Sequence, residues 1–289
     1  MTRPPAAAIA ILSSVQPLVP TADGWLSDIW GVIHNGRAAF PAAADACCRF
    51  RSAGGSVVLV TNAPRPEAAV AEMLDRLGVP RAAWDAIVTS GDVTRELIAP
   101  WSGRALFHLG PDRDAGIFAG LDVKLVPAAS AEAIVCSGLF DDDIETPETY
   151  RPMLEDFRMR DVPMICANPD IVVERGERLV YCAGAIAELY EEQGGHVVYA
   201  GKPHLPIYTR AFEAFAEVRG RPLAKERILA IGDGLKTDIK GARQAGLRSL
   251  FIASALHVPA GRAFDAGLLA ELFADDPHPP IAAQAALAW

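Results

Sequence analysis

Short β-branched apolar runs alternate along this chain with segments of helical composition, and this alternation is the feature that most restricts its fold. The run Ser56–Val60 lies between two helical segments, Ala42–Ser52 and Pro66–Leu77, and a further strand candidate, Ala86–Thr89, follows. Proline at the start of a helix and glycine after its end mark the boundaries of these segments. Strands that alternate with helices predict an α/β fold with a doubly wound parallel sheet.

The middle of the chain keeps this alternation but differs in composition. Between about residues 90 and 194, short strand candidates lie among acidic and proline-containing segments, and from His196 onward the composition is again like that of the first 89 residues. The simplest architecture is a core domain of residues 1–89 and 195–289, interrupted by an inserted smaller α/β domain of residues 90–194. The insertion carries strand candidates at Ala105–Leu109, Val123–Val126, Ile134–Ser137 and Met164–Ala167; later strands are expected at His196–Tyr199, Ile228–Ile231 and Ser249–Ile252, and later helices at Pro206–Val218 and Lys236–Ala245.

Composition limits the partners of this protein. The 289 residues are 51% hydrophobic, enough for a large core, and the net charge of -9 argues against non-specific nucleic-acid binding, which needs a basic face. The apolar stretch near the N-terminus is too short and too interrupted by proline to span a membrane. Five cysteines without metal-ligand spacing favour reduced thiols in a cytoplasmic protein, and Cys136 is expected to be a packed strand thiol.

Four predicted strands lead into a chemically distinct residue. The stretch Trp25–Gly36, WLSDIWGVIHNG, carries Asp28 where an apolar run meets a polar segment, and Thr61, Lys202 and Asp233 lie at the ends of three further runs. Because ligands of open α/β sheets bind at the carboxyl ends of strands, we expect these residues to converge. Carboxylates hold a hard cation such as Mg²⁺, and one of them can attack phosphorus. A hydroxyl and an ammonium group compensate charge on phosphoryl oxygens, so the set predicts phosphoryl chemistry.

The same residues carry a resemblance to a known family. Asp28 in DIWGVIHNG, Thr61 in VVLVTN, Lys202 in YAGKPHLPIY, and Asp233 and Asp238 in IGDGLKTDIKGARQAG follow one another in the order of four sequence motifs. In these motifs the chain resembles class IIA phosphatases of the haloacid dehalogenase superfamily, and the matches span nearly its whole length. The resemblance implies a Rossmann-like core, an inserted α/β cap and a Mg²⁺ cofactor. It also implies a small phosphorylated metabolite as substrate and allows a homodimer through the cap.

Roles for individual residues also come from the resemblance. It makes Asp28 the nucleophile and a metal ligand, with Asp233 and the main-chain carbonyl of Trp30 as further ligands and Asp238 as an outer metal partner. It makes Lys202 the charge clamp, with Thr61 as the second catalytic position.

The expected substrate contacts are Asn62, His34, and Asn168 and Asp170 in the segment CANPD. For Asn168 and Asp170 a second interpretation stays open, a turn required by Pro169. The acidic run Asp141–Asp143 is expected to be a solvated loop, because the spaced ligands of a calcium site are missing.

Trp30 is the main departure from the family pattern. Phosphatases of this family carry an aspartate two residues after the nucleophile, which acts as general acid for the leaving group. An indole cannot deliver that proton, and general acid catalysis contributes roughly 10²–10⁴-fold. His34, expected in a mobile loop beyond Trp30, is one candidate to replace the acid; the alternative is a loop histidine that touches solvent or the cap.

Three functions are therefore weighed. The leading one is a Mg²⁺-dependent phosphatase of small organic phosphates, which acts through an aspartyl phosphate on Asp28. The second is a catalytically impaired relative that acts as a phosphate-ligand binding protein or a regulatory protein. The presence of Trp30 favours this second function. The third is a nucleotide-binding α/β protein that uses IGDGLKTD as a phosphate loop, and the absence of a G-x-G-x-x-G run counts against it.

Overall fold

A computed structural model describes residues 9–175, 178–253, 258 and 262–289. The chain divides into two compact units, the first of residues 1–60, 74–87 and 211–289, the second of residues 61–73 and 88–210. The second unit contains the segment 90–194 that the sequence predicts as an insertion, together with flanking residues. That this unit acts as a cap stays a prediction.

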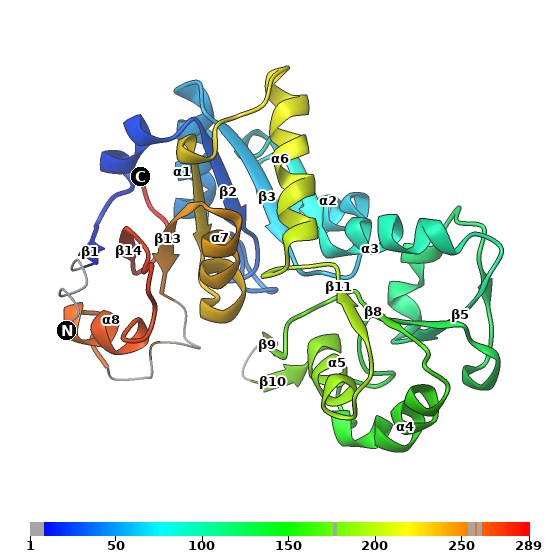
Figure 1. Ribbon diagram of the computed structural model, residues 1–289. Helices are drawn as coiled ribbons and strands as arrows, with labels where there is room; N and C mark the ends of the chain where they lie inside the picture. Colours follow the sequence, from blue (N-terminus) through cyan, green and yellow to red (C-terminus); the bar gives the residue numbers. More distant parts are fainter. Residues whose placement is uncertain (1–8, 176–177, 254–257, 259–261) are drawn as a thin grey trace. The chain divides into compact units, whose positions relative to one another are not determined.

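The first unit is built on a seven-stranded sheet in the order β1-β14-β13-β12-β2-β3-β4 (Figure 1). The pairs β1–β14, β14–β13, β13–β12, β12–β2 and β2–β3 are parallel, as the alternation of strands and helices predicts. The strands are β1 (Ala10–Ile11), β2 (Gly24–Asp28), β3 (Ser56–Thr61), β4 (Ala86–Thr89), β12 (Ile228–Gly232), β13 (Arg248–Ile252) and β14 (Ala282–Gln284).

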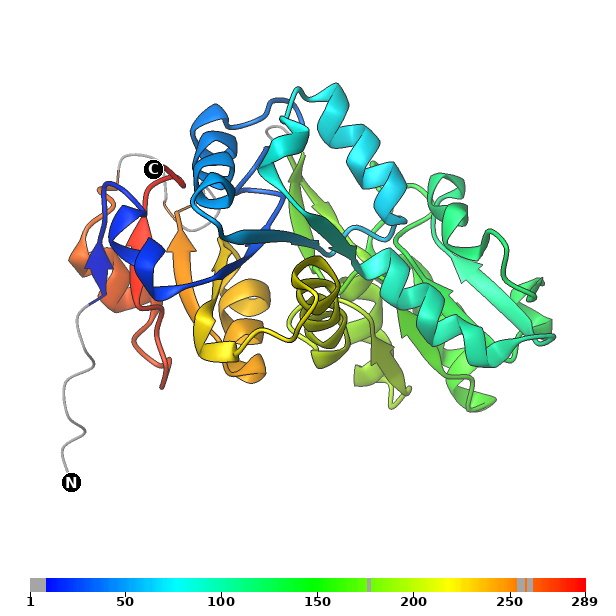
Figure 2. The same ribbon diagram turned by 90° about the horizontal axis from the view of Figure 1, so that it is seen from above.

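Helices cover both faces of this sheet. Figure 2 shows α1 and α7 on opposite faces, which makes the sheet doubly wound. The side chain of Trp25 on β2 stacks on Phe50 of α1, with ring centroids 4.0 Å apart and an interplanar angle of 5°. Every residue of β2, β3 and β12 is buried, as expected for central parallel strands covered on both faces. The helices of this unit are α1 (Pro41–Ser52), α7 (Lys240–Ala245) and α8 (Ala266–Leu272). Two further helices, α2 (Glu67–Arg76) and α6 (Leu205–Arg219), each have residues in both units.

The second unit has a parallel sheet of its own, in the order β11-β8-β7-β5-β6. Its core lies between this sheet and α4 and α5, where Phe157 and Ile186 pack with Ile134 and Met164. An antiparallel hairpin of β9 and β10 completes the unit. The elements are α3 (Ser90–Ile98), β5 (Ala105–Leu109), β6 (Lys124–Leu125), β7 (Ala133–Cys136), α4 (Arg151–Met159), β8 (Met164–Cys166), β9 (Val172–Arg175), β10 (Arg178–Tyr181), α5 (Ala183–Glu192) and β11 (Val197–Tyr199).

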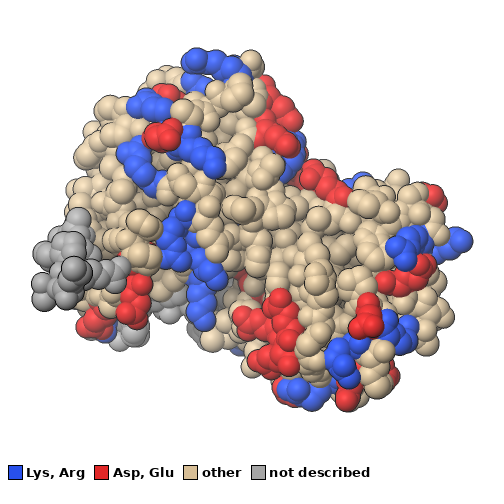
Figure 3. Space-filling model, viewed as in Figure 1, with Lys and Arg blue, Asp and Glu red and all other residues tan. Residues whose placement is uncertain are grey.

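The predicted fold class, an α/β fold with a parallel core sheet and a second, smaller α/β unit, is confirmed. The sequence did not predict the β9–β10 hairpin, and the first turn of the helix expected at Lys236–Ala245 is a π-turn, Leu235–Ile239. Among the described residues, no helix is long and apolar enough to cross a membrane. On the face shown in Figure 3, acidic and basic side chains are interspersed.

Candidate active site

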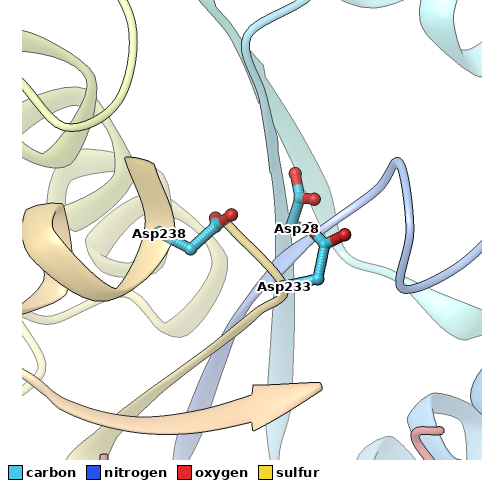
Figure 4. A group of neighbouring side chains, drawn as sticks. All are labelled: Asp28, Asp233 and Asp238. Atoms are coloured by element: carbon cyan, nitrogen blue, oxygen red, sulfur yellow. The ribbon is translucent and has the colours of Figure 1, made fainter. Parts of the chain in front are cut away.

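Three aspartates of the first unit bring their carboxylates together. Asp28 is the last residue of β2, and Asp233 follows β12, the strand that pairs with β2. Asp238 lies in the π-turn that precedes α7. One oxygen of each carboxylate lies within 4.8 Å of the others, and Figure 4 shows the three side chains grouped at the strand ends. Asp28 is only 5% exposed, so a cation would offset the cost of burying its charge.

The cluster fits the metal that the family resemblance implies. Mg²⁺ prefers oxygen ligands in an octahedron at about 2.0–2.1 Å, so oxygens that share one ion lie within roughly 4.2 Å of each other. The mutual spacing of the three carboxylates, at most 4.8 Å, is close to that limit. All three donors are hard carboxylate oxygens, which suit Mg²⁺ better than a softer transition metal.

Glycines make room for these carboxylates. Gly31 has a φ of +86°, and a Cβ built there would lie 2.7 Å from Cγ of Asp233 and closer still to Oδ2. A Cβ on Gly232 would collide in the same way with the side chain of Asp238. The backbone N–H of Gly234 donates to Oδ2 of Asp238 at 3.1 Å, which orients that carboxylate. The G-D-G sequence around Asp233 therefore serves close packing against the acidic cluster.

Trp30 is packed within its own loop. Its indole lies edge-to-face with the His34 imidazole, with ring centroids 5.2 Å apart. On the other side it covers Gly36, where a built Cβ would lie 2.8 Å from Cζ2 of the indole. The backbones of Trp30 and His34 form an isolated bridge, and the N–H of Gly31 donates to the carbonyl of His34 at 2.8 Å. The side chain that replaces the family's aspartate thus has a structural role in residues 30–36.

The structure corrects the expectation for His34. Its side chain is 0% exposed instead of lying in a solvent-facing, mobile loop. Burial lowers its pKa to about 4, so the ring is neutral at neutral pH. Nδ1 accepts a hydrogen bond from the N–H of Gly36 at 2.8 Å, and Nε2 is buried without a partner in the part of the chain that is described. A buried neutral imidazole is unsuited to replace the missing acid, and it cannot reach a substrate in this conformation.

The other predicted residues meet around Asn62 in the second unit. The Asn62 amide donates to the carbonyl of Lys202 at 3.1 Å and accepts from its N–H at 2.7 Å. The same amide donates to Oδ1 of Asp170 at 2.9 Å. Lys202 is 3% exposed, and its neighbour Gly201 packs so tightly that a Cβ there would lie 2.7 Å from Pro169 and closer still to the Asn62 amide. Asn62 therefore fixes the backbone of the lysine that the resemblance makes the charge clamp.

Two further predicted residues lie in the same unit. Thr61 ends β3 directly after Val60, the residue that pairs with Asp28 in the sheet, and its hydroxyl accepts from the N–H of Ala63 at 3.2 Å. Oδ1 of Asn168 accepts from the N–H of Asp170 at 3.1 Å, which closes the turn around Pro169. The side chain of Asn168 thus stabilises the turn around Pro169, as the second interpretation expected, whereas the side chain of Asp170 accepts a hydrogen bond from Asn62.

Two expectations outside the site also have outcomes. Cys136 is a buried strand thiol, and burial raises its pKa to about 12. The run Asp141–Asp143 is not simply a solvated loop, because Asp142 forms ion pairs at 2.5 Å with Arg113 and with Arg175. Sequence reasoning missed these partners because they lie about 30 residues away on either side.

Comparisons with known proteins identify the family of this chain. A family model described as haloacid dehalogenase-like hydrolase matches residues 25–124, and a second, described as HAD-hydrolase-like, matches residues 199–267. No curated protein sequence matches. A hydrolase of the haloacid dehalogenase-like family from Brucella suis 1330 is 45% identical, with a TM-score of 0.84 over 95% of this chain and 98% of that one.

The chain belongs to the haloacid dehalogenase-like hydrolase family. The predictions of a class IIA, phosphatase-like hydrolase of this superfamily and of an enzyme are confirmed. A structure described as a possible sugar phosphatase from Cytophaga hutchinsonii shares the fold at 22% identity, with a TM-score of 0.76 over 95% of this chain and 97% of that one. A glycerol phosphate phosphatase from Mycobacterium tuberculosis, in complex with calcium, is 26% identical, with a TM-score of 0.63 over 81% of this chain and 67% of that one.

Proposed function

We propose that this protein is a Mg²⁺-dependent phosphatase that hydrolyses small organic phosphates, of the sugar- or nucleotide-phosphate class, through an aspartyl phosphate on Asp28. The observation that carries the proposal is the group of Asp28, Asp233 and Asp238, whose carboxylate oxygens lie within 4.8 Å of one another at the strand ends. The phosphatases among the similar structures support it, and one relative is described in complex with magnesium.

Asp28 performs the covalent chemistry in this proposal. One of its carboxylate oxygens forms a bond to phosphorus while the bond from phosphorus to the leaving oxygen breaks. Water then attacks phosphorus, which releases inorganic phosphate and regenerates the carboxylate. Mg²⁺, held by Asp28, Asp233 and the Trp30 carbonyl with Asp238 beside them, would supply neutralisation of the phosphoryl charge.

The remaining roles rest on the family resemblance. Lys202 and the Thr61 hydroxyl compensate charge on the phosphoryl oxygens, and Asn62 holds the lysine in place. Asn168 and Asp170 belong to the loop that faces the substrate, in a second unit that acts as a cap. A homodimer through this unit is part of the same proposal.

Trp30 sets the chemical range of the proposed activity. With an indole at this position, residue 30 cannot protonate the leaving oxygen, so esters of acidic alcohols and phenols should react best. The same feature supports the second candidate, a relative that binds a phosphate ligand without turning it over. A protein that binds Mg²⁺ and phosphate but hydrolyses no ester at all would establish that second function.

The test is to replace Asp28 by asparagine and to compare it with Asp45→Asn, which removes an exposed carboxylate of α1 that pairs with Arg49. Hydrolysis of 4-nitrophenyl phosphate should require Mg²⁺, persist in Asp45→Asn, and disappear in Asp28→Asn. Acid quenching during turnover, followed by peptide mass spectrometry, should find one phosphoryl group on the peptide that contains Asp28. Full activity in Asp28→Asn, or activity without any divalent cation, would overturn the proposal.

A further inference from the structure

An aromatic pair joins the two ends of the turn that carries Lys202. This turn, residues 200–204, connects β11 to α6, and it lies between Tyr199, the last residue of β11, and the start of the helix. The rings of Tyr199 and His204 stack, with centroids 4.3 Å apart and an interplanar angle of 7°. The backbone closes the same turn, because the N–H of His204 donates to the carbonyl of Gly201 at 3.0 Å. Lys202 therefore lies inside a turn that is closed by two different contacts.

Tyr199 is held in place independently of His204. Its hydroxyl donates to Oε2 of Glu191 on α5 at 2.7 Å, and its ring packs against the hydrophobic core of the second unit. Burial and the hydrogen bond to Glu191 raise the pKa of Tyr199, so the hydroxyl keeps its proton and remains a donor at neutral pH. Tyr199 is thus a fixed surface on which the His204 ring lies.

The two halves of the turn are held by different groups. In the first half, the N–H of Ala200 donates to a carbonyl of β8 at 3.0 Å, and the Asn62 amide contacts the N–H and the carbonyl of Lys202 at 2.7 and 3.1 Å. In the second half, the stack of His204 on Tyr199 holds the chain where it enters α6. The stack therefore supplements the contacts of Asn62 on the other side of Lys202.

The position of this turn matters because the side chain of Lys202 is buried. Lys202 is 3% exposed, so its ammonium group has lost most of its water and depends on contacts within the protein. Electrostatic stabilisation of a phosphoryl group is most effective when the charged donor is already in place. A turn that moved would displace this donor, so the contacts that fix the turn should affect anion binding.

We propose that His204 and Tyr199 are positioning residues for Lys202, and that the stack of their rings keeps the Lys202 ammonium group where it binds a phosphoryl group. The inference rests on the proposed function for the role of Lys202, but neither of its tests depends on turnover. If the two rings only cover the core, their loss should lower the stability of the whole unit and have no specific effect on Lys202.

The first test is amide hydrogen exchange measured by NMR in the full chain. The Lys202 amide should exchange roughly two- to tenfold faster in His204→Leu, the worth of one stacked aromatic pair, and at nearly the wild-type rate in His204→Phe, which keeps a flat ring. The Ala167 amide, which donates to the carbonyl of Cys136 at 2.8 Å, reports on general stability and should not change. Equal acceleration of both amides, or no acceleration of the Lys202 amide, would refute the inference.

The second test is calorimetric binding of inorganic phosphate in the presence of Mg²⁺, arranged as a double-mutant cycle with Lys202→Met. His204→Leu alone should weaken phosphate binding roughly two- to tenfold, and His204→Phe should restore most of the affinity. In the Lys202→Met background, His204→Leu should have no further effect, because the group through which it acts is gone. His196→Leu is the matched control and should bind phosphate like the wild type, because His196 is exposed just before β11, at the opposite end of that strand from Tyr199.

Substitution of the other ring tests the stack itself. Tyr199→Leu should weaken phosphate binding about as much as His204→Leu, and the two changes together should weaken it little further, because either one removes the stack. Tyr199→Phe keeps both rings and removes only the hydrogen bond to Glu191, so its effect should be smaller than that of Tyr199→Leu.

Phosphate affinity that is unchanged in His204→Leu, or that falls by the same factor with and without Lys202, would overturn the inference. A wild type that binds no phosphate, or that binds it equally well as Lys202→Met, would overturn it too, because Lys202 would then hold no anion. Failure of the phosphatase proposal looks different. In that case no ester is hydrolysed, while the exchange rates and the phosphate affinities still report on His204 and Lys202.

Discussion

Replacement of Gly31 by alanine tests whether the loop after β2 positions the carboxylate of Asp233, which we propose binds Mg²⁺. The φ of Gly31 is +86°, and an added Cβ would lie 2.7 Å from Cγ of Asp233. Such a contact is too short for real Cβ atoms, so Asp233 or the loop must move. Gly54 offers a matched control in the same unit, because its φ is +92° and a Cβ there would meet nothing within 4 Å.

The two substitutions should lower the stability of the fold equally, but only Gly31→Ala should lower the affinity for Mg²⁺. A left-handed backbone costs an alanine about 1–2 kcal/mol, so both variants should lose about that much free energy of unfolding. Gly31→Ala should also weaken Mg²⁺ binding by about 10–100-fold, which is typical when the support of a metal ligand is lost. This loss corresponds to about 1.4–2.7 kcal/mol of binding free energy.

Urea unfolding measures the loss of stability that both variants should show. Calorimetric titration with Mg²⁺ measures the loss of affinity expected only in Gly31→Ala. Gly54→Ala should bind Mg²⁺ with the affinity of the wild type, and 4-nitrophenyl phosphate turnover at limiting Mg²⁺ should fall only in Gly31→Ala. If both variants bind Mg²⁺ equally well, the close packing of Gly31 against Asp233 has no role in the metal site.

Three other substitutions address the remaining residues of the site. Asn62→Ala removes both hydrogen bonds to the Lys202 backbone. We expect the free energy of unfolding in urea to fall by about 1–3 kcal/mol and turnover to fall at least tenfold. Turnover equal to that of the wild type would contradict the role of Asn62 in positioning Lys202. His34 has a pKa of about 4 when folded against 6.5 when unfolded, so the unfolded state binds its proton first as the pH falls. The wild type should therefore lose roughly 2–3 kcal/mol between pH 6.5 and pH 4 that His34→Asn does not lose, and parallel curves of stability against pH would refute this. Trp30→Asp should raise turnover of alkyl phosphates relative to aryl phosphates, up to the roughly 10²–10⁴-fold scale of acid catalysis, and an unchanged ratio of the two rates would show that residue 30 cannot serve as the acid.

Local patterns in the sequence were sufficient to predict the strands that carry the site. The apolar runs before Asp28 and Asp233 are short and each ends at a polar residue, so both strands are expected nearly where they occur. The rule that parallel strands present their carboxyl ends at one edge then predicted that these two carboxylates would meet. The π-turn that brings Asp238 to them depends on tertiary packing against Gly232 and Gly234, which no periodicity in the sequence reveals.

Burial of polar side chains is the property that the sequence did not reveal. His34 lies in the segment HNG, which is polar and rich in turn residues, yet its ring is fully buried beneath Trp30. His108 and Ser137 lie in predicted strands, but the sequence does not reveal that Nε2 of His108 lies 2.9 Å from the Ser137 hydroxyl. What could not be read from the sequence is that Asp114, a few residues after β5, is buried in an ion pair with Arg65.

The replacement of the family's aspartate by Trp30 is best understood together with the residues that follow it. The indole covers Gly36 and contacts His34, and Nδ1 of His34 in turn accepts the N–H of Gly36. An aspartate at position 30 would remove the ring from this arrangement and place a carboxylate near an imidazole whose Nε2 is buried without a partner among the described residues. The half-buried indole contributes up to about 3 kcal/mol by packing, so Trp30→Asp exchanges stability of the loop for a proton donor.

The Gly31 N–H, which donates to the His34 carbonyl, links the same loop to the glycine beside Asp233. Residues 30–36 therefore act as a single folded support beside the three carboxylates of the proposed metal site, and the tryptophan is a part of that support.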